Sequence, residues 1–138
     1  MATIVLDTGV IIAVLDRDDV HASAVHSALV PIREAGASFC LSVVTFAELL
    51  VESSGAQPNA EQVVGAFVDS LGTDAIQPVS AEVARIAAKI RTGNRRVRMP
   101  DALIAATAET IGAEALLTTD KKLAKLPRAR YIGERSRH

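Results

Sequence analysis

Apolar positions follow two different spacings along this chain. Short apolar runs, such as residues 3–6, predict buried strands, whereas segments with apolar residues three or four positions apart predict helices. The predicted strands cover residues 3–6, 38–42, 114–120 and 129–132, with a brief apolar run at 75–79. The predicted helices cover residues 10–15, 20–35, 43–52, 60–71, 82–91, 101–111 and 121–126. Because strands alternate with helices through short connections, the pattern predicts a parallel α/β sandwich.

Length and composition fit one globular domain. The chain has 138 residues, so we expect a single domain over residues 1–138 with no linker. Aromatic residues make up only 3%, so the core must consist of Ala, Val, Leu and Ile. Cys40 is the one cysteine; it has no partner for a disulfide or a thiolate metal site and is interpreted as buried filler. No apolar run approaches the about 18 residues of a membrane helix, and the N-terminus has no basic leader, so we expect a soluble cytoplasmic protein.

The net charge of −1 hides an uneven distribution of charged residues. Residues 1–80 hold ten acids and two bases, a net charge of −8, whereas residues 81–138 hold six acids and thirteen bases, a net charge of +7. This asymmetry permits an acidic site beside a basic surface, as metal-binding carboxylates acting on a polyanion require. Two solvated faces of a nearly neutral protein are the alternative interpretation.

Four acids stand at comparable positions of the predicted elements. Asp7 and Asp120 directly follow strands, Glu48 lies about one and a half turns into the helix after the second strand, and Asp101 opens its own helix behind Pro100. Because ligands of open α/β sheets gather at the carboxyl ends of the strands, we expect these side chains to converge there. Singly, each acid has a simpler interpretation: a helix cap for Asp7 and Asp120, a partner of the helix dipole for Asp101, a surface acid for Glu48.

Converging carboxylates repel one another, so they favour a bound cation. A hard divalent ion with oxygen ligands, Mg²⁺ or Mn²⁺, meets that need and activates water for attack on a phosphodiester. The hydroxyls of Thr8, Thr118 and Thr119 are candidates to orient a bound water or a ligand carboxylate, with capping or turn chemistry as the alternative. No zinc site is expected, because no histidine or cysteine is placed to build one. The three histidines are interpreted as surface or filler residues: His21, His26 and His138.

Four segments in this order and spacing resemble the signatures of the PIN-domain nucleases: "IVLDT", "SVVTFAELL", "MPDALIAATA" and "LLTTD". The resemblance covers essentially the whole chain and is greatest to the VapC-type toxins of prokaryotic toxin–antitoxin modules. It implies a three-layer α/β/α PIN-like sandwich with a mainly parallel central sheet of four to five strands. By motif position, the acidic quartet corresponds to Asp7, Glu48, Asp101 and Asp120, and the hydroxyl residue before the last acid to Thr118.

The resemblance also implies an activity and partners. We expect an endoribonuclease that depends on Mg²⁺ or Mn²⁺, inhibits translation and leaves 5′-phosphate and 3′-hydroxyl ends. Asp7, Asp101 and Asp120 are expected to hold the metal. A homodimer silenced by a VapB-type antitoxin, with which it forms a hetero-oligomer, is implied as well. Relatives often continue the last motif with an acid and an aromatic residue, whereas "KKLAKL" follows Asp120, so one tightly held ion is preferred to two.

Basic residues flank two of the proposed metal ligands and are candidates to bind RNA phosphates. They are Arg91, Arg95, Arg96 and Arg98 before Asp101, and Lys121, Lys122 and Lys125 after Asp120. Guanidinium groups suit phosphate geometry, although solubility alone also explains such residues. With so few aromatic residues, base stacking cannot be the main means of recognition, so shape and phosphate contacts would select the target.

Two other functions are compatible with part of the pattern. A phosphotransfer domain would use Asp7 as the nucleophile. Dehalogenase-like phosphatases, however, need a second aspartate where Gly9 stands, and a response-regulator receiver would want an early acidic pair and a lysine after its last core strand. Glu48 has no role in either class. A non-catalytic PIN-like module that binds RNA or protein is the remaining alternative, against which the presence of all four acids argues.

Overall fold

A computed structural model describes residues 2–53 and 59–135 of the chain. In this part, five parallel strands form one sheet in the order β3-β2-β1-β4-β5. The strands are β1 (Thr3–Leu6), β2 (Ser38–Ser42), β3 (Ile76–Gln77), β4 (Ala115–Thr118) and β5 (Ala129–Tyr131). The mainly parallel sheet of four to five strands expected from the sequence is confirmed.

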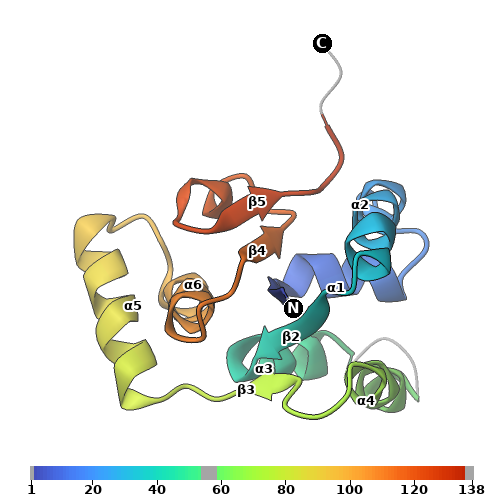
Figure 1. Cartoon of the computed structure of the whole chain (residues 1–138), viewed down its shortest axis with the longest axis horizontal. Helices are drawn as coiled ribbons and strands as arrows, with labels where there is room; N and C mark the ends of the chain where they lie inside the picture. Colours follow the sequence, from blue (N-terminus) through green and yellow to red (C-terminus); the bar gives the residue numbers. More distant parts are fainter. Residues whose placement is uncertain (1, 54–58, 136–138) are drawn as a thin grey trace.

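Helices cover both faces of this sheet (Figure 1). They are α1 (Thr8–Leu15), α2 (Ala22–Glu34), α3 (Val43–Ser53), α4 (Ala60–Ser70), α5 (Ala81–Gly93) and α6 (Met99–Thr110). Side chains alternate along β1: Ile4 and Leu6 belong to the core beneath α1 to α4, whereas Val5 packs with Ile104 of α6. Helix α5 then packs on α6 through Val83 and Ala87. The expected three-layer α/β/α sandwich is therefore confirmed.

Several element boundaries differ from those expected. The helix expected over 10–15 begins two residues earlier, at Thr8, because Asp7 caps it. The helix expected over 121–126 is only a 3₁₀ turn at Leu123–Lys125, because Pro127 disfavours a helical conformation at the residue before it. The apolar run at 75–79 forms the two-residue edge strand β3, since Pro78 cannot donate a ladder hydrogen bond.

Other expectations concern burial and membranes. Cys40 is buried, and burial raises the pKa of its thiol to about 11, so it is a filler side chain as expected. No helix of the described ranges has both the length and the apolar character needed to cross a bilayer. His138 lies outside the described residues.

The strand order determines where a ligand site can form. β1 lies at the centre of the sheet between β2 and β4. The chain adds β2 and β3 on one side of β1 and then adds β4 and β5 on the other side. The connections after β1 and β4 therefore leave in opposite directions, which opens a crevice at the carboxyl ends of these strands. Asp7 follows β1 directly, and Asp120 lies two residues beyond β4.

Candidate active site

Asp7 is held at the end of β1 by two hydrogen bonds. Its Oδ1 accepts from the backbone N–H of Thr8 at 2.8 Å, and its Oδ2 accepts from Thr118 Oγ1 at 2.7 Å. The first bond caps α1, so the simpler interpretation of this acid is correct as far as it goes. The second bond joins the ends of β1 and β4. Both bonds fix the carboxylate, which is only 7% exposed, at the crevice.

Glu48 reaches the same place from α3. Its Oε1 accepts from Thr8 Oγ1 at 2.6 Å, and that hydroxyl also lies 3.3 Å from Thr45 Oγ1. A hydroxyl has only one proton to donate, and the carboxylate of Glu48, at the shorter distance, is the stronger acceptor for the proton of Thr8. Glu48 is thus half-buried and oriented, rather than the surface acid of the simpler interpretation.

Thr118 also fixes the last motif. Its Oγ1 accepts from the backbone N–H of Asp120 at 2.9 Å, and Asp120 Oδ1 accepts from the N–H of Lys122 at 2.8 Å. The expected cap of a helix beginning at Lys121 is wrong, because only the 3₁₀ turn at Leu123–Lys125 forms and no side chain of the described ranges caps it; the exposed carboxylate of Asp120 instead closes the turn through Lys122. Thr119 approaches the start of α1 so closely that a Cβ on Gly9 would lie 2.2 Å from its hydroxyl oxygen.

Asp101 is the third residue of α6, in its first turn behind Pro100. Burial, the charge of Asp120 and that of Glu48 raise the pKa of Asp101, while the guanidinium of Arg98 lowers it. The helix end favours an acid at this position, yet the neighbouring carboxylates outweigh that effect. Asp101 is half-buried between acids.

Asp101 connects the four carboxylates electrostatically, because it interacts with each of the other three. The pKa of Asp7 is raised from 3.8 to about 6, chiefly by burial, with the charges of Asp101 and Glu48 adding to it. Hydrogen bonds from Thr118 and Thr8 oppose that rise without cancelling it. Asp120 acts in turn on Asp101. The structure therefore brings the quartet to one edge of the sheet and leaves it short of positive charge.

The donor set fits a hard divalent cation. Among the described residues, no three His, Cys, Asp or Glu side chains lie close enough to hold an ion in common. Mg²⁺, however, commonly takes only one or two carboxylates directly and keeps several waters. Carboxylates whose pKa is raised by burial and further by one another's charges are the ligands that such a hydrated ion would stabilise.

Comparisons with known proteins agree with this geometry. The family model described as PIN domain matches residues 4–129. The chain belongs to the PIN domain family. The resemblance of the four motifs to the PIN-domain nucleases is thereby confirmed. No curated protein is similar enough to count as a match.

Solved structures resemble this PIN domain over nearly its whole length. VapBC-5 from Mycobacterium tuberculosis, a member of the VapBC family of toxin–antitoxin systems, is 26% identical over 97% of this chain and 100% of that chain, with a TM-score of 0.63. VapBC2 from Rickettsia felis, bound to promoter DNA, is 18% identical over 94% and 98%, with a TM-score of 0.74. VapC20 from M. tuberculosis, described as a toxin that cleaves the sarcin–ricin loop, is 19% identical over 92% and 98%, with a TM-score of 0.66.

The basic residues of this PIN domain differ in their surroundings. Arg91 is half-buried, and its Nη1 donates to the carbonyl oxygens of Arg95 at 3.0 Å and Val97 at 2.6 Å. It therefore orders the connector between α5 and α6. Arg95, Arg96 and Arg98 on that connector are exposed, as are Lys121 and Lys122 beside Asp120. The roles of all these residues in RNA binding stay predictions. For Arg91 the structure adds the hydrogen bonds to the connector.

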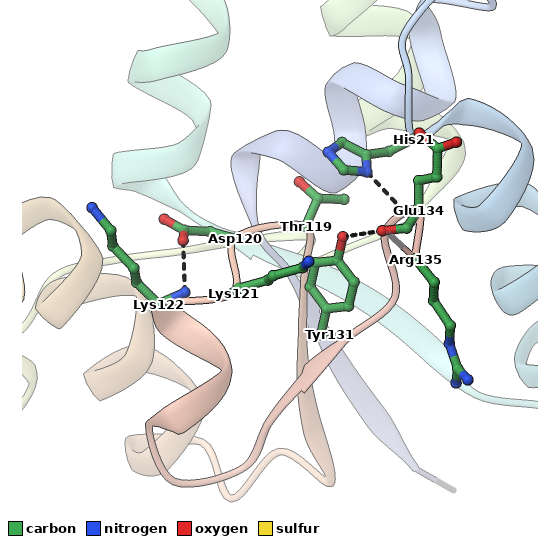
Figure 2. A pocket seen from close by; sticks show the side chains of 8 residues that line it. All are labelled: His21, Thr119, Asp120, Lys121, Lys122, Tyr131, Glu134 and Arg135. Carbon is green, nitrogen blue, oxygen red and sulfur yellow. Dashed lines mark hydrogen bonds between the residues drawn. The ribbon is translucent and has the colours of Figure 1, made fainter. Parts of the chain in front are cut away.

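Sequence reasoning missed two parts of the site. Thr45 is fully buried one turn before Glu48, and only its spacing within "SVVTFAELL" hinted at a role. A cavity of about 740 Å³ also lies beside Asp120. Figure 2 shows it lined by the two lysines after Asp120, by Tyr131 and by the segment that ends at Arg135. His21, expected to be surface or filler, lines it as well.

Proposed function

We propose that this PIN domain is an endoribonuclease dependent on Mg²⁺ or Mn²⁺ and the toxin of a toxin–antitoxin module. The observation that carries the proposal is the convergence of four acids at the crevice between β1 and β4, where Asp101 lies in the electrostatic field of Asp7, Glu48 and Asp120. Support also comes from VapC20 of M. tuberculosis, a toxin that cleaves the sarcin–ricin loop. RNA as substrate places the action in the cytoplasm.

Asp7, Asp101 and Asp120 would hold the ion, in part through its bound waters, and the ion when bound would supply an activated water and neutralise charge on the leaving oxygen. The protein's contribution is orientation. Thr118 fixes both Asp7 and the backbone of Asp120 through a single hydroxyl. Ligands that are already oriented lose little conformational freedom when a substrate binds. The reaction should therefore be faster than with a loosely held set of acids.

Glu48 has a separate role in the proposal. Its Oε1 is occupied by the Thr8 hydroxyl, which leaves the other carboxylate oxygen to accept a proton or a hydrogen bond from a water at the crevice. The proton of Thr8 is directed to Glu48 because the carboxylate is a stronger acceptor than the more distant Thr45 hydroxyl. This hydrogen bond holds the carboxylate near Asp7 and Asp101.

The partners follow from the relatives. Several similar structures are toxin–antitoxin complexes, among them one from Klebsiella pneumoniae at 25% identity. We expect this chain to form a homodimer and to bind a cognate VapB-type antitoxin in a hetero-oligomer that silences the site. The exposed Arg95, Arg96, Lys121 and Lys122 would contact RNA phosphates.

The test is metal-dependent cleavage by purified protein freed of any antitoxin. Structured RNA should be cut with Mg²⁺ or Mn²⁺, and EDTA or Asp101→Asn should abolish the cutting. Glu82→Gln, which changes an exposed acid in the first turn of α5, is the matched control and should cut as the wild type does. Unchanged cleavage by Asp101→Asn would remove this residue from the mechanism. Metal-independent RNA binding with no cleavage would instead identify a non-catalytic binding module.

A further inference from the structure

The cavity beside Asp120 has the features of a binding site for one nucleotide. Its volume of about 740 Å³ is within the range of about 300–1,000 Å³ that small-ligand sites occupy. Asp120 belongs both to this cavity and to the acidic quartet, so whatever occupies the cavity lies next to the site of the proposed reaction.

The cavity is built by fixed backbone rather than left between loose loops. The N–H of Glu134 donates to His21 Nδ1 at 2.8 Å, and Tyr131 Oη donates to the carbonyl oxygen of Glu134. Gly133 is buried between the same two side chains: a Cβ there would lie 2.6 Å from His21 Nδ1 and 2.7 Å from Tyr131 Oη. The segment after β5 is thus fastened to the start of α2, as Figure 2 shows.

The chemistry of the lining matches a phosphate joined to an aromatic base. Three cations, Lys121, Lys122 and Arg135, line the cavity against the two carboxylates of Asp120 and Glu134. Tyr131 supplies an aromatic ring, with Lys121 Nζ 5.6 Å from the ring centroid. Cations bind phosphate oxygens, and aromatic rings in single-strand sites stack on bases whatever the sequence.

We infer that this cavity binds one unpaired nucleotide of the RNA next to the cleaved bond, with its base against Tyr131 and its phosphate among the basic side chains that line the cavity. The inference rests on the proposed ribonuclease function and extends it. It also changes the expectation that stacking has little part in recognition: the chain has one tyrosine, and that tyrosine lies in this cavity. RNA is favoured over a protein partner because the cavity shares Asp120 with the quartet.

A test without divalent metal separates the inference from catalysis. The chain has no tryptophan and one tyrosine, so tyrosine fluorescence reports this cavity alone. In EDTA, adenosine 5′-monophosphate should quench that fluorescence saturably, after correction for absorption by the base. Ribose 5-phosphate, which lacks the base, should bind at least about fivefold more weakly. Absence of saturable quenching, or equal binding of both probes, would overturn the nucleotide assignment.

Variants locate the binding. Lys122→Ala with Arg135→Ala should weaken binding of adenosine 5′-monophosphate at least about tenfold, because charge-assisted contacts to the phosphate are lost. Lys89→Ala, an exposed lysine of α5, is the control and should bind as the wild type does. Measured by calorimetry, Tyr131→Phe should retain binding and Tyr131→Leu should lose it. If Tyr131→Leu does not fold, Tyr131→Phe still tests the inference, because it keeps the ring.

The outcomes for the two proposals differ. Nucleotide binding in EDTA without Mg²⁺-dependent cleavage would leave the cavity assigned and overturn the ribonuclease. Metal-dependent cleavage, with wild-type binding of the nucleotide and of RNA by the Lys122 and Arg135 variant, would overturn the cavity assignment alone. Wild-type RNA binding by that variant with loss of the cognate antitoxin would assign the cavity to the protein partner and likewise overturn the inference.

Discussion

At the scale of single residues, the hydroxyl of Thr118 connects the two halves of the acidic quartet. It donates to Asp7, which follows β1, and accepts from the backbone of Asp120, which follows β4. Thr118 is fully buried, so neither bond competes with bulk water. A methyl group in place of this hydroxyl would leave the shape of the site unchanged and remove its connection.

Thr118→Val should therefore lower both stability and activity. The free energy of unfolding should fall by about 1–3 kcal/mol, because a buried carboxylate and a backbone N–H each lose a partner. Cleavage should fall about 10- to 100-fold, as is typical when a group that orients a metal ligand is removed. Thr107→Val is the matched control: Thr107 is also fully buried, but its hydroxyl donates within α6 to Leu103 O. Equal loss of cleavage in both variants would contradict the role of Thr118.

Asp7 makes the metal-free protein less stable as the pH rises. Its pKa is higher in the folded protein, about 6, than its ordinary value of 3.8, so the folded state binds the proton more tightly. The stabilisation is complete below pH 3.8 and is lost as the pH rises through 6. A shift of roughly two units corresponds to about 3 kcal/mol. In EDTA, denaturation curves of wild type and Asp7→Asn should diverge by about this amount between pH 4 and pH 7, with wild type the less stable at pH 7. Parallel curves would show that Asp7 ionises freely.

The sequence was sufficient to identify the acids but not all of their supports. Thr118 was predicted because, within the motif "LLTTD", it matches the hydroxyl residue that precedes the last acid in the PIN-domain nucleases. Thr45 was not, because one threonine within an apolar helix looks like any other core residue until its neighbour across the crevice is known. Arg91 was grouped with the other arginines since spacing alone does not show that its guanidinium turns back onto the carbonyls of Arg95 and Val97.

At the scale of elements, α1 and the end of β4 are in unusually close contact. Gly9 of α1 has room only for a hydrogen where Thr119 approaches, since a Cβ would lie 2.2 Å from Thr119 Oγ1. Asp7 caps α1 and Asp120 follows Thr119. Separating these two segments would therefore also separate two of the acids.

Gly9→Ala should destabilise the protein by about 1–3 kcal/mol and reduce cleavage. Gly65→Ala is the control: Gly65 lies within α4 with open space at its Cβ position, so alanine there should stabilise by about 0.5–1 kcal/mol. Adding Thr119→Ala to Gly9→Ala removes Thr119 Oγ1, the atom nearest to the new Cβ, and should restore stability. Thermal denaturation measures this. A double variant as unstable as Gly9→Ala would place the strain elsewhere.

Element types followed from periodicity, whereas their exact ends did not. The segments 3–6 and 38–42 correspond residue for residue to β1 and β2, because the central positions of both strands are covered on the two faces and hold apolar side chains. The segment 121–126 has helical spacing, yet three lysines and the following Pro127 leave only the turn at Leu123–Lys125. Local competition of this kind is decided by turn and proline chemistry that spacing does not record.

At the scale of the whole molecule, strand order makes one site from distant motifs. The sequence indicated parallel strands with acids at their carboxyl ends, but many strand orders are compatible with that pattern. Only an order that places β4 beside β1 brings Asp120 next to Asp7. The fold also places the basic connector before Asp101 and the lysines after Asp120 at the same acidic edge, so the charge asymmetry of the sequence becomes an acidic centre with basic flanks.

This charge arrangement predicts a defined salt dependence of RNA binding. Each phosphate contact made to single-stranded RNA contributes about 0.7 to the slope of log affinity against log salt. Arg95→Ala with Arg96→Ala should therefore weaken binding in EDTA and reduce the magnitude of that slope by about 1.4, because both side chains are exposed on the connector before Asp101. Arg33→Ala, an exposed arginine at the end of α2 in the acidic half of the chain, should leave the slope unchanged. Binding measured by fluorescence anisotropy across a salt series checks this, and an unaltered slope in the double variant would assign these arginines to the solvated surface rather than to the RNA.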